Sequence, residues 1–200
     1  NLSWGGHVGP HDGTDAVDQN CDGYILRNYP EGSLIVISAG NEGSDKLHQS
    51  KTFSNNDSIL RTFAVTTSYG QNVSSPIDFW GQVGNTFAVK VSVVDTQSRS
   101  IIGSTRFGMS SSTSTGALVI NNTNCTIQYY IYPTHPYNNK PNITLVVSNA
   151  NESNAKRKVM VEVIATTGTV HEWINDGYFS SCNYPSAVAG NTNYTINAFG

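Results

Sequence analysis

The fold is decided by the stretch FAVKVSV at residues 87–93, in which apolar side chains recur at every second position. Successive side chains of an extended strand point to opposite faces, so the phenylalanine and the three valines share one face. The same period places Val159, Val161 and Val163 together on a second run. This alternation predicts antiparallel strands that each bury one face.

Similar short runs recur along the chain between clusters of Gly, Asn, Ser and Pro, which are typical of turns. They lie at residues 60–67, 118–121, 126–132, 143–148 and 169–174. Many short strands without helical periodicity predict an antiparallel, jelly-roll-like β-sandwich. We expect it to span residues 46–188, with a core that includes Val89, Val91, Val161 and Val163.

The beginning of the chain has a different pattern. LIVI at residues 34–37 is a continuous apolar run, typical of a strand buried on both faces of a parallel sheet. Before it, Thr14 can cap a helix that ends ahead of Pro30 and carries Val17, Cys21, Tyr24 and Ile25 at helical spacing. With residues 1–4 as a preceding strand, residues 1–45 form a small α/β piece of strand, helix and strand, a βαβ unit.

Composition excludes several classes of partner. The 200 residues contain 11 Lys and Arg against 14 Asp and Glu, and only 12% of residues are charged. Without a basic run the chain lacks the charge that binds phosphate backbones, so we expect no nucleic-acid partner. The sequence has no apolar stretch of about 18 residues, so we expect no membrane span.

Metal and redox sites are also not expected from the sequence. Cys21, Cys125 and Cys182 are far apart and form no CxxC pair, and their disulfide state stays open. The N-terminal residues His7, His11, Asp12 and Asp15 contain enough donors for a metal, but their spacing fits no tetrahedral site. We interpret them as a polar surface loop, and no cofactor is expected. The adjacent pair His11 and Asp12 is not expected to form a catalytic dyad.

Two motifs resemble one enzyme family. SAGNEG at residues 38–43, directly after the apolar run, resembles the segment of subtilisin-like serine peptidases that carries the oxyanion-hole asparagine. NLSWGG at residues 1–6 resembles the strand on which those enzymes bind the substrate backbone. HEWI at residues 171–174 followed by GNTNYTI at 190–196 resembles the return into the catalytic domain in bacterial members that carry a large insertion. The stretch at residues 7–14 also resembles that subgroup.

The resemblance implies a role for each matching residue. Asn41 would donate to the oxyanion, Gly40 would allow close approach of the substrate, and Ala39 would line the pocket beside the scissile bond. Ser3, Trp4 and Gly5 would pair with the extended peptide. The structural alternative for Asn41 is a turn cap. Trp4, where the family usually has Leu, either reshapes the neighbouring subsites or is a core residue.

The family's catalytic Asp and His precede the substrate strand, and its nucleophilic Ser follows the return segment, so all three would lie outside this chain. GTDA at residues 13–16 is similar to the nucleophile motif but has Asp where Ser is required. We therefore expect an internal fragment of a bacterial serine endopeptidase that is inactive by itself. Its parts would be residues 1–45 of the catalytic core, the insertion at 46–188 and the return segment at 189–200.

Alternative functions remain open at the level of sequence. The sandwich can be a noncatalytic module that recognises protein or carbohydrate, or a brace for its parent domain. Candidate aromatic platforms are Trp80, Tyr129, Tyr130, Tyr132, Tyr137 and Trp173. For the parent enzyme the expected partner is a peptide or protein substrate, in a secreted or cell-envelope location. The apolar run at 34–37 lacks the neighbours of a full parallel sheet, so we also expect self-association through this region.

Overall fold

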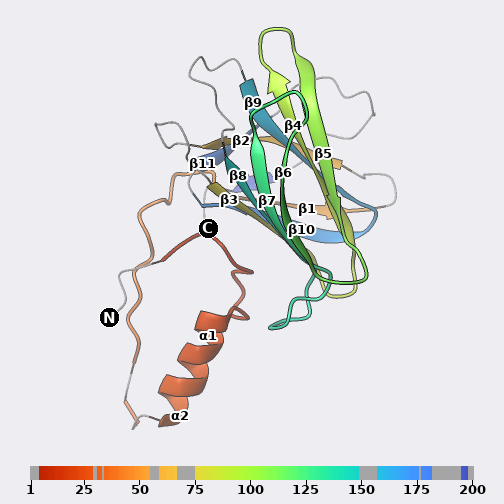
Figure 1. Ribbon diagram of the computed structural model, residues 1–200. Coiled ribbons are helices and arrows are strands. Elements are labelled where there is room, and N and C mark those ends of the chain that lie inside the picture. The colour runs from red at the N-terminus through yellow and green to blue at the C-terminus, as the bar shows by residue number, and fades with distance from the viewer. Residues whose placement is uncertain are drawn as a thin grey trace.

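The computed structural model describes residues 5–28, 31–32, 34–54, 59–66, 75–148, 157–175, 177–181 and 195–197. Two antiparallel sheets form a β-sandwich (Figure 1). The seven-stranded sheet has the order β12 (Thr195–Asn197), β1 (His48–Phe53), β10 (Gly168–Ile174), β3 (Ser75–Trp80), β8 (Asn142–Ser148), β7 (Thr126–Tyr132) and β6 (Ser114–Val119). The five-stranded sheet has the order β11 (Gly177–Ser181), β2 (Ile59–Thr66), β9 (Arg157–Ala165), β4 (Phe87–Asp95) and β5 (Ser100–Gly108).

The predicted mostly-β, antiparallel fold is confirmed, and the alternating valines form its core. Strand β4 pairs with β9 so that Val89 lies opposite Val163 and Val91 lies opposite Val161. All four side chains are 0% exposed. Burying each valine contributes about 1.5 kcal/mol or more, so these cross-strand pairs are a major source of stability for the sandwich.

A polar contact joins the two sheets inside this core. Gln49 of β1 is fully buried and donates a hydrogen bond of 2.8 Å from Nε2 to Oγ1 of Thr62 in β2. The same amide donates to Oε2 of Glu172 in β10, which is also fully buried. Desolvation raises the pKa of Glu172 to about 8, and the hydrogen bond from Gln49 opposes that rise. The carboxyl group is therefore mostly protonated at neutral pH.

The predicted helix forms, but its cap differs from the prediction. Segments α1 (Ala16–Asn20), η1 (Cys21–Ile25) and α2 (Leu26–Asn28) follow one another, and η1 is a π-helical turn. The N-cap is Asp15, whose carboxylate accepts the amide of Val17. Thr14 is not the cap, because its hydroxyl donates to Asp12. No residue of α1 is buried, and Figure 1 shows the helix standing apart from the sandwich.

The apolar run at residues 34–37 is not buried in a sheet. Leu34 is 74% exposed, Val36 53% and Ile37 60%, and only an isolated bridge is formed, at Ile37. The buried parallel strand expected at these residues is therefore not formed in the described part of the chain, which leaves the apolar run uncovered. The strand expected at residues 1–4 lies outside the described residues. Within the described part of the chain, no helix has the length and apolar character needed to span a membrane.

Candidate functional site

The loop at residues 38–43 follows the exposed apolar run and makes a tight turn. Gly40 has a φ of 84°, and a Cβ at this position would lie 3.0 Å from Oε2 of Glu42, so another residue here would be strained. The backbone amide of Asn41 donates to the same Glu42 oxygen at 2.8 Å, and the amide of Asp45 donates to the Glu42 carbonyl at 2.9 Å. The turn leaves Asn41 at the surface.

This turn and the residues after the expected substrate strand border one cavity of about 420 Å³, which we call the first hollow. Its volume lies in the usual range of ligand sites. The structure thereby brings Gly5 beside Ala39, Gly40 and Asn41, four of the residues assigned to the site from the sequence. The other two, Ser3 and Trp4, lie outside the described residues. An amide donor and a glycine-rich wall suit the binding of a peptide carbonyl group.

A second hollow of about 550 Å³ shares Gly5, Gly6 and His7 with the first. Its further wall comes from the sandwich, where Asn175, Gly177 and Tyr178 lie at the β10–β11 turn and the start of β11. Sequence reasoning missed these three residues. They are distant along the chain from residues 5–7, and no local pattern could have placed them there.

The segment after the substrate strand is anchored to the sandwich by alternate backbone amides. His7 donates from its amide to Oδ1 of Asn175 at 3.1 Å, and Gly9 donates to Oδ2 of Asp78 at 2.8 Å. Asp78 of β3 is only 1% exposed. Its carboxylate accepts three more hydrogen bonds of 2.6–2.7 Å, from the side chains of Trp80, Asn142 and Thr144. A buried carboxylate with four donors is a well-satisfied anchor.

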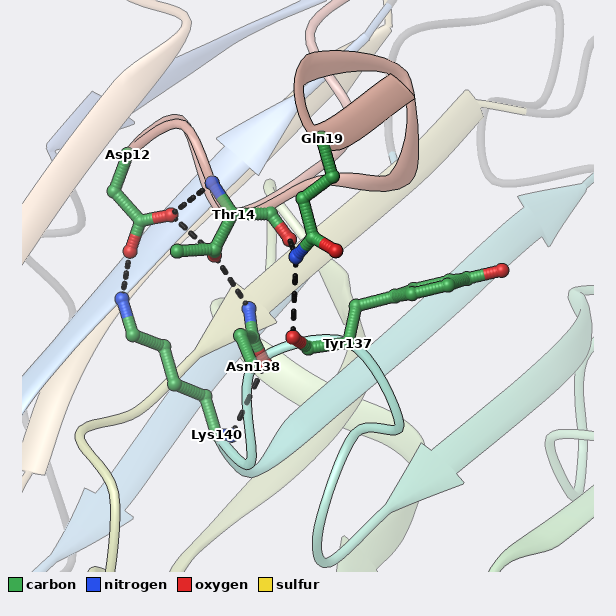
Figure 2. A network of polar contacts seen from close by, with 6 residues as sticks. All are labelled: Asp12, Thr14, Gln19, Tyr137, Asn138 and Lys140. Atoms are coloured by element: carbon green, nitrogen blue, oxygen red, sulfur yellow. Dashed lines mark hydrogen bonds and ion pairs between the residues drawn. The ribbon is translucent and has the colours of Figure 1, made fainter. Parts of the chain in front are cut away.

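Further contacts continue this anchoring toward the helix (Figure 2). Asp12 forms an ion pair with Lys140, and Asn138 donates from Nδ2 to the Thr14 hydroxyl at 2.9 Å. Gln19 donates from Nε2 to the carbonyl of Tyr137 at 3.2 Å. Desolvation alone would raise the pKa of Asp12, but the hydrogen bonds from Lys140 and Thr14 outweigh it and lower the pKa.

A row of stacked rings lies beside these contacts. The His11 ring stacks on Trp173 with centroids 3.6 Å apart, and Trp173 stacks on His48 at 3.9 Å. His48 Nε2 lies 3.0 Å from His171 Nδ1. Desolvation lowers the pKa of His11, of His171 and of His48, the last to about 4 with added repulsion from the other two rings. The uncharged rings can therefore stack closely at neutral pH.

The candidate donors of the N-terminal segment have separate partners. His11 stacks on Trp173, Asp12 pairs with Lys140, and Asp15 caps the helix. The side chains of His11 and Asp12 therefore have different partners and are not arranged as a catalytic dyad. Among the residues that the structure describes, no three His, Cys, Asp or Glu side chains come together as metal ligands.

Two of the three cysteines lie in the described residues. Cys21 and Cys125 are free thiols. Burial raises the pKa of Cys125 to about 11, so it stays protonated and unreactive at neutral pH. Cys182 lies outside the described residues.

Comparison with known proteins gives a likeness in fold. No family model and no curated protein sequence matches this chain. Among solved structures, the CspB protease of Clostridium perfringens is similar, with a TM-score of 0.64 at 16% sequence identity. The match covers 91% of this chain and 37% of the protease chain, so this chain spans little more than a third of that protein. The chain therefore has the fold of one part of a protease.

Proposed function

We propose that this chain is part of a subtilisin-like serine endopeptidase and supplies its oxyanion-hole asparagine and one substrate-binding strand. The observation that carries the proposal is the first hollow, in which Gly5, Ala39, Gly40 and Asn41 meet. These residues belong to the two motifs that resemble the family, and the fold likeness to a protease supports the same interpretation.

In this function Asn41 acts on the transition state of acyl transfer. Attack on a peptide carbonyl builds negative charge on its oxygen, and a fixed amide donor stabilises that charge. The surface position of Asn41 leaves it accessible to a bound peptide, and Gly40 keeps the neighbouring backbone free of a side chain. The strand at residues 3–5 pairs with the extended peptide through backbone hydrogen bonds. The catalytic Asp, His and Ser lie outside this chain.

The proposal also assigns the parts of the chain and its location. Residues 1–45 and the return segment at 189–200 belong to the catalytic core, and residues 46–188 form an inserted sandwich. The return segment meets the sandwich through β12, which pairs with β1. The location is secreted or cell-envelope, in a bacterium. A carbohydrate-binding module is less well supported, because Trp80 and Trp173, the largest candidate platforms, are only 5% exposed.

The test is to treat the full-length protein with a fluorophosphonate probe, which forms a covalent adduct only with an activated serine. We expect one labelled serine downstream of residue 200 and hydrolysis of peptide substrates at the same enzyme concentration. The 200-residue chain alone serves as the control and should remain unlabelled. A full-length protein that neither reacts with the probe nor cleaves peptides would overturn the proposal.

A further inference from the structure

The second hollow has one wall from the candidate catalytic part and one from the sandwich. The amide of His7 donates to Oδ1 of Asn175, which joins the two walls directly. The amide of Ile174 donates to the Leu47 carbonyl at 3.0 Å, and that of Phe179 donates to the Lys46 carbonyl at 2.8 Å. These backbone bonds fix the β10–β11 turn against residues 46–47. The wall is therefore held in place by ordered backbone on both sides of the turn.

The shape of the second hollow suits a large side chain. The wall at residues 5–6 carries no side chain, and nothing lies within 4 Å of the position that a Cβ of Gly5 would take. Tyr178 also borders the hollow. It is 40% exposed, which leaves ring surface available to a ligand. The volume of about 550 Å³ exceeds what a small aliphatic side chain would fill.

The charges around this hollow favour a cation. Glu42 and Asp45 contribute two carboxylates, against one ammonium group from Lys46. Oε2 of Glu42 already lies 3.8 Å from Nε2 of His7, so Asp45 is the carboxylate left for a ligand. Asp45 is exposed, so its carboxylate is accessible to a ligand. A guanidinium or ammonium group can also lie over the face of a tyrosine ring such as that of Tyr178. An acidic side chain would meet net repulsion in the same place.

We propose that Tyr178 and Asp45 are specificity-determining residues, and that the second hollow accepts an arginine or lysine side chain of the peptide substrate. The inference rests on the proposed peptidase function, and it makes the inserted sandwich part of the substrate site. Tyr178 contacts the aliphatic or planar part of the side chain, and Asp45 pairs with its charge. Residues 5–7 border both hollows and so connect this subsite to Asn41.

The test uses the full-length enzyme and fluorogenic peptides in which each position around the scissile bond carries Arg, Lys, Gln or Glu in turn. We expect the wild type to prefer Arg over Glu at one position by about tenfold in kcat/KM. Asp45→Asn should reduce the preference for Arg over Gln at that position. Tyr178→Ala should reduce kcat/KM for both Arg and Lys there, while Tyr178→Phe, which keeps the ring, should retain the wild-type profile.

The matched control is Tyr130→Ala, which removes another exposed tyrosine from the sandwich, in β7, and should leave the profile unchanged. An active enzyme whose profile is the same in wild type, Asp45→Asn and Tyr178→Ala overturns this inference and leaves the proposed function standing. A wild type that neither cleaves any peptide nor reacts with the fluorophosphonate probe overturns both.

Discussion

The backbone amide of Gly9 donates a 2.8 Å hydrogen bond to the carboxylate of Asp78, which lies in a strand of the sandwich and is almost completely buried. This bond joins two segments that are 69 residues apart in the sequence. The motif assigned to substrate binding ends at Gly6, three residues before Gly9, so a residue of the sandwich helps to hold the segment that follows it. The two parts of the chain are therefore expected to respond together when Asp78 is changed.

Asp78→Ala is expected to destabilise the protein by about 3 kcal/mol or more, because it leaves several donors without an acceptor. The free energy of unfolding is measured by urea denaturation, and exchange of the Gly9 amide is followed by NMR. That amide should exchange faster in the variant. Asp18→Ala, which removes an exposed carboxylate from the helix, is the control. Unchanged exchange at Gly9 would contradict the anchoring role.

Glu172→Gln is expected to change how stability depends on pH. The pKa of Glu172 is raised from 4.5 to about 8 in the folded protein, so the folded state keeps a proton that the unfolded state releases between these values. The free energy of unfolding of the wild type therefore falls as the pH rises through that window. The variant is always neutral and should be more stable than the wild type at pH 8 by a few kcal/mol, with a smaller difference at pH 4.5.

Urea denaturation at both pH values measures the effect of Glu172→Gln. The amide group of the new glutamine can also donate to Oε1 of Gln49, which has no hydrogen-bond partner among the residues that the structure describes. Glu31→Gln, at an exposed position, should show no such pH-dependent gain. If the two variants respond alike, the raised pKa of Glu172 is wrong.

His48 should destabilise the protein at acid pH. Its pKa is lowered from 6.5 to about 4, so the unfolded state takes up a proton that the folded state excludes between these values. The contribution of the neutral ring is present above pH 6.5 and is lost as the pH falls toward 4. His48→Phe keeps a ring against Trp173 and should flatten this dependence. Both proteins also carry Glu172→Gln, which removes the opposing titration of Glu172. If the free energy of unfolding falls equally steeply between pH 6.5 and 4 with and without His48→Phe, the predicted effect of His48 is wrong.

Asn41→Ala in the active full-length enzyme should lower kcat strongly and change KM little, because the donor acts mainly on the transition state. The reference value is from subtilisin itself, where losing one oxyanion donor costs about 2.7–4 kcal/mol, or roughly 10²–10³ in kcat. Steady-state kinetics with active-site titration measure it. Asn124→Ala, at an exposed position in the β6–β7 loop, is the control. A normal kcat in Asn41→Ala would favour the turn-cap interpretation.

The exposed apolar run predicts self-association of the 200-residue chain. Leu34 and Val36 are more than half exposed, and burying them between two copies is favourable. Analytical ultracentrifugation should detect dimers or larger species of the wild type, and Leu34→Glu with Val36→Glu should shift the chain toward monomer. Val83→Glu places a charge at an apolar residue that is 62% exposed in the sandwich and serves as the control. A wild type that is monomeric at high concentration would show the prediction wrong.

The strands that could be predicted are those whose side chains alternate in polarity. Residues 87–93 became β4, and the run at 126–132 has the same bounds as β7. Strand β1 was not predicted, because its sequence HQSKTF has no apolar alternation. Its buried positions include Gln49 and Lys51. The Nε2 amide of Gln49 donates to Thr62 and Glu172, and Lys51 donates to the Ile59 carbonyl. Such partners come from distant segments and cannot be inferred from the strand alone.

The candidate site divides in the same way. A turn at residues 38–43 could be inferred because its small residues and glycines determine its backbone locally, and Gly40 adopts a left-handed conformation that favours glycine. The opposite wall at Tyr178 could not, because only the packing of the sandwich brings it to residues 5–7. The helix cap could not be predicted to the residue, because Thr14 and Asp15 are both good N-cap residues. The Thr14 hydroxyl donates to Asp12, so Asp15 accepts the helix amide instead.

Strand β12 pairs with β1 at the edge of the larger sheet, so Thr195 lies opposite Ser50 although almost the whole sandwich separates them along the chain. A folded unit whose entry and exit are adjacent closes a host loop in much the same way as a short turn does. The entropy of loop closure for the host then depends on the short distance between the two ends and not on the length of the inserted chain. A domain of this topology can be acquired by, or removed from, a surface loop of another protein with little disturbance to the folding of its host.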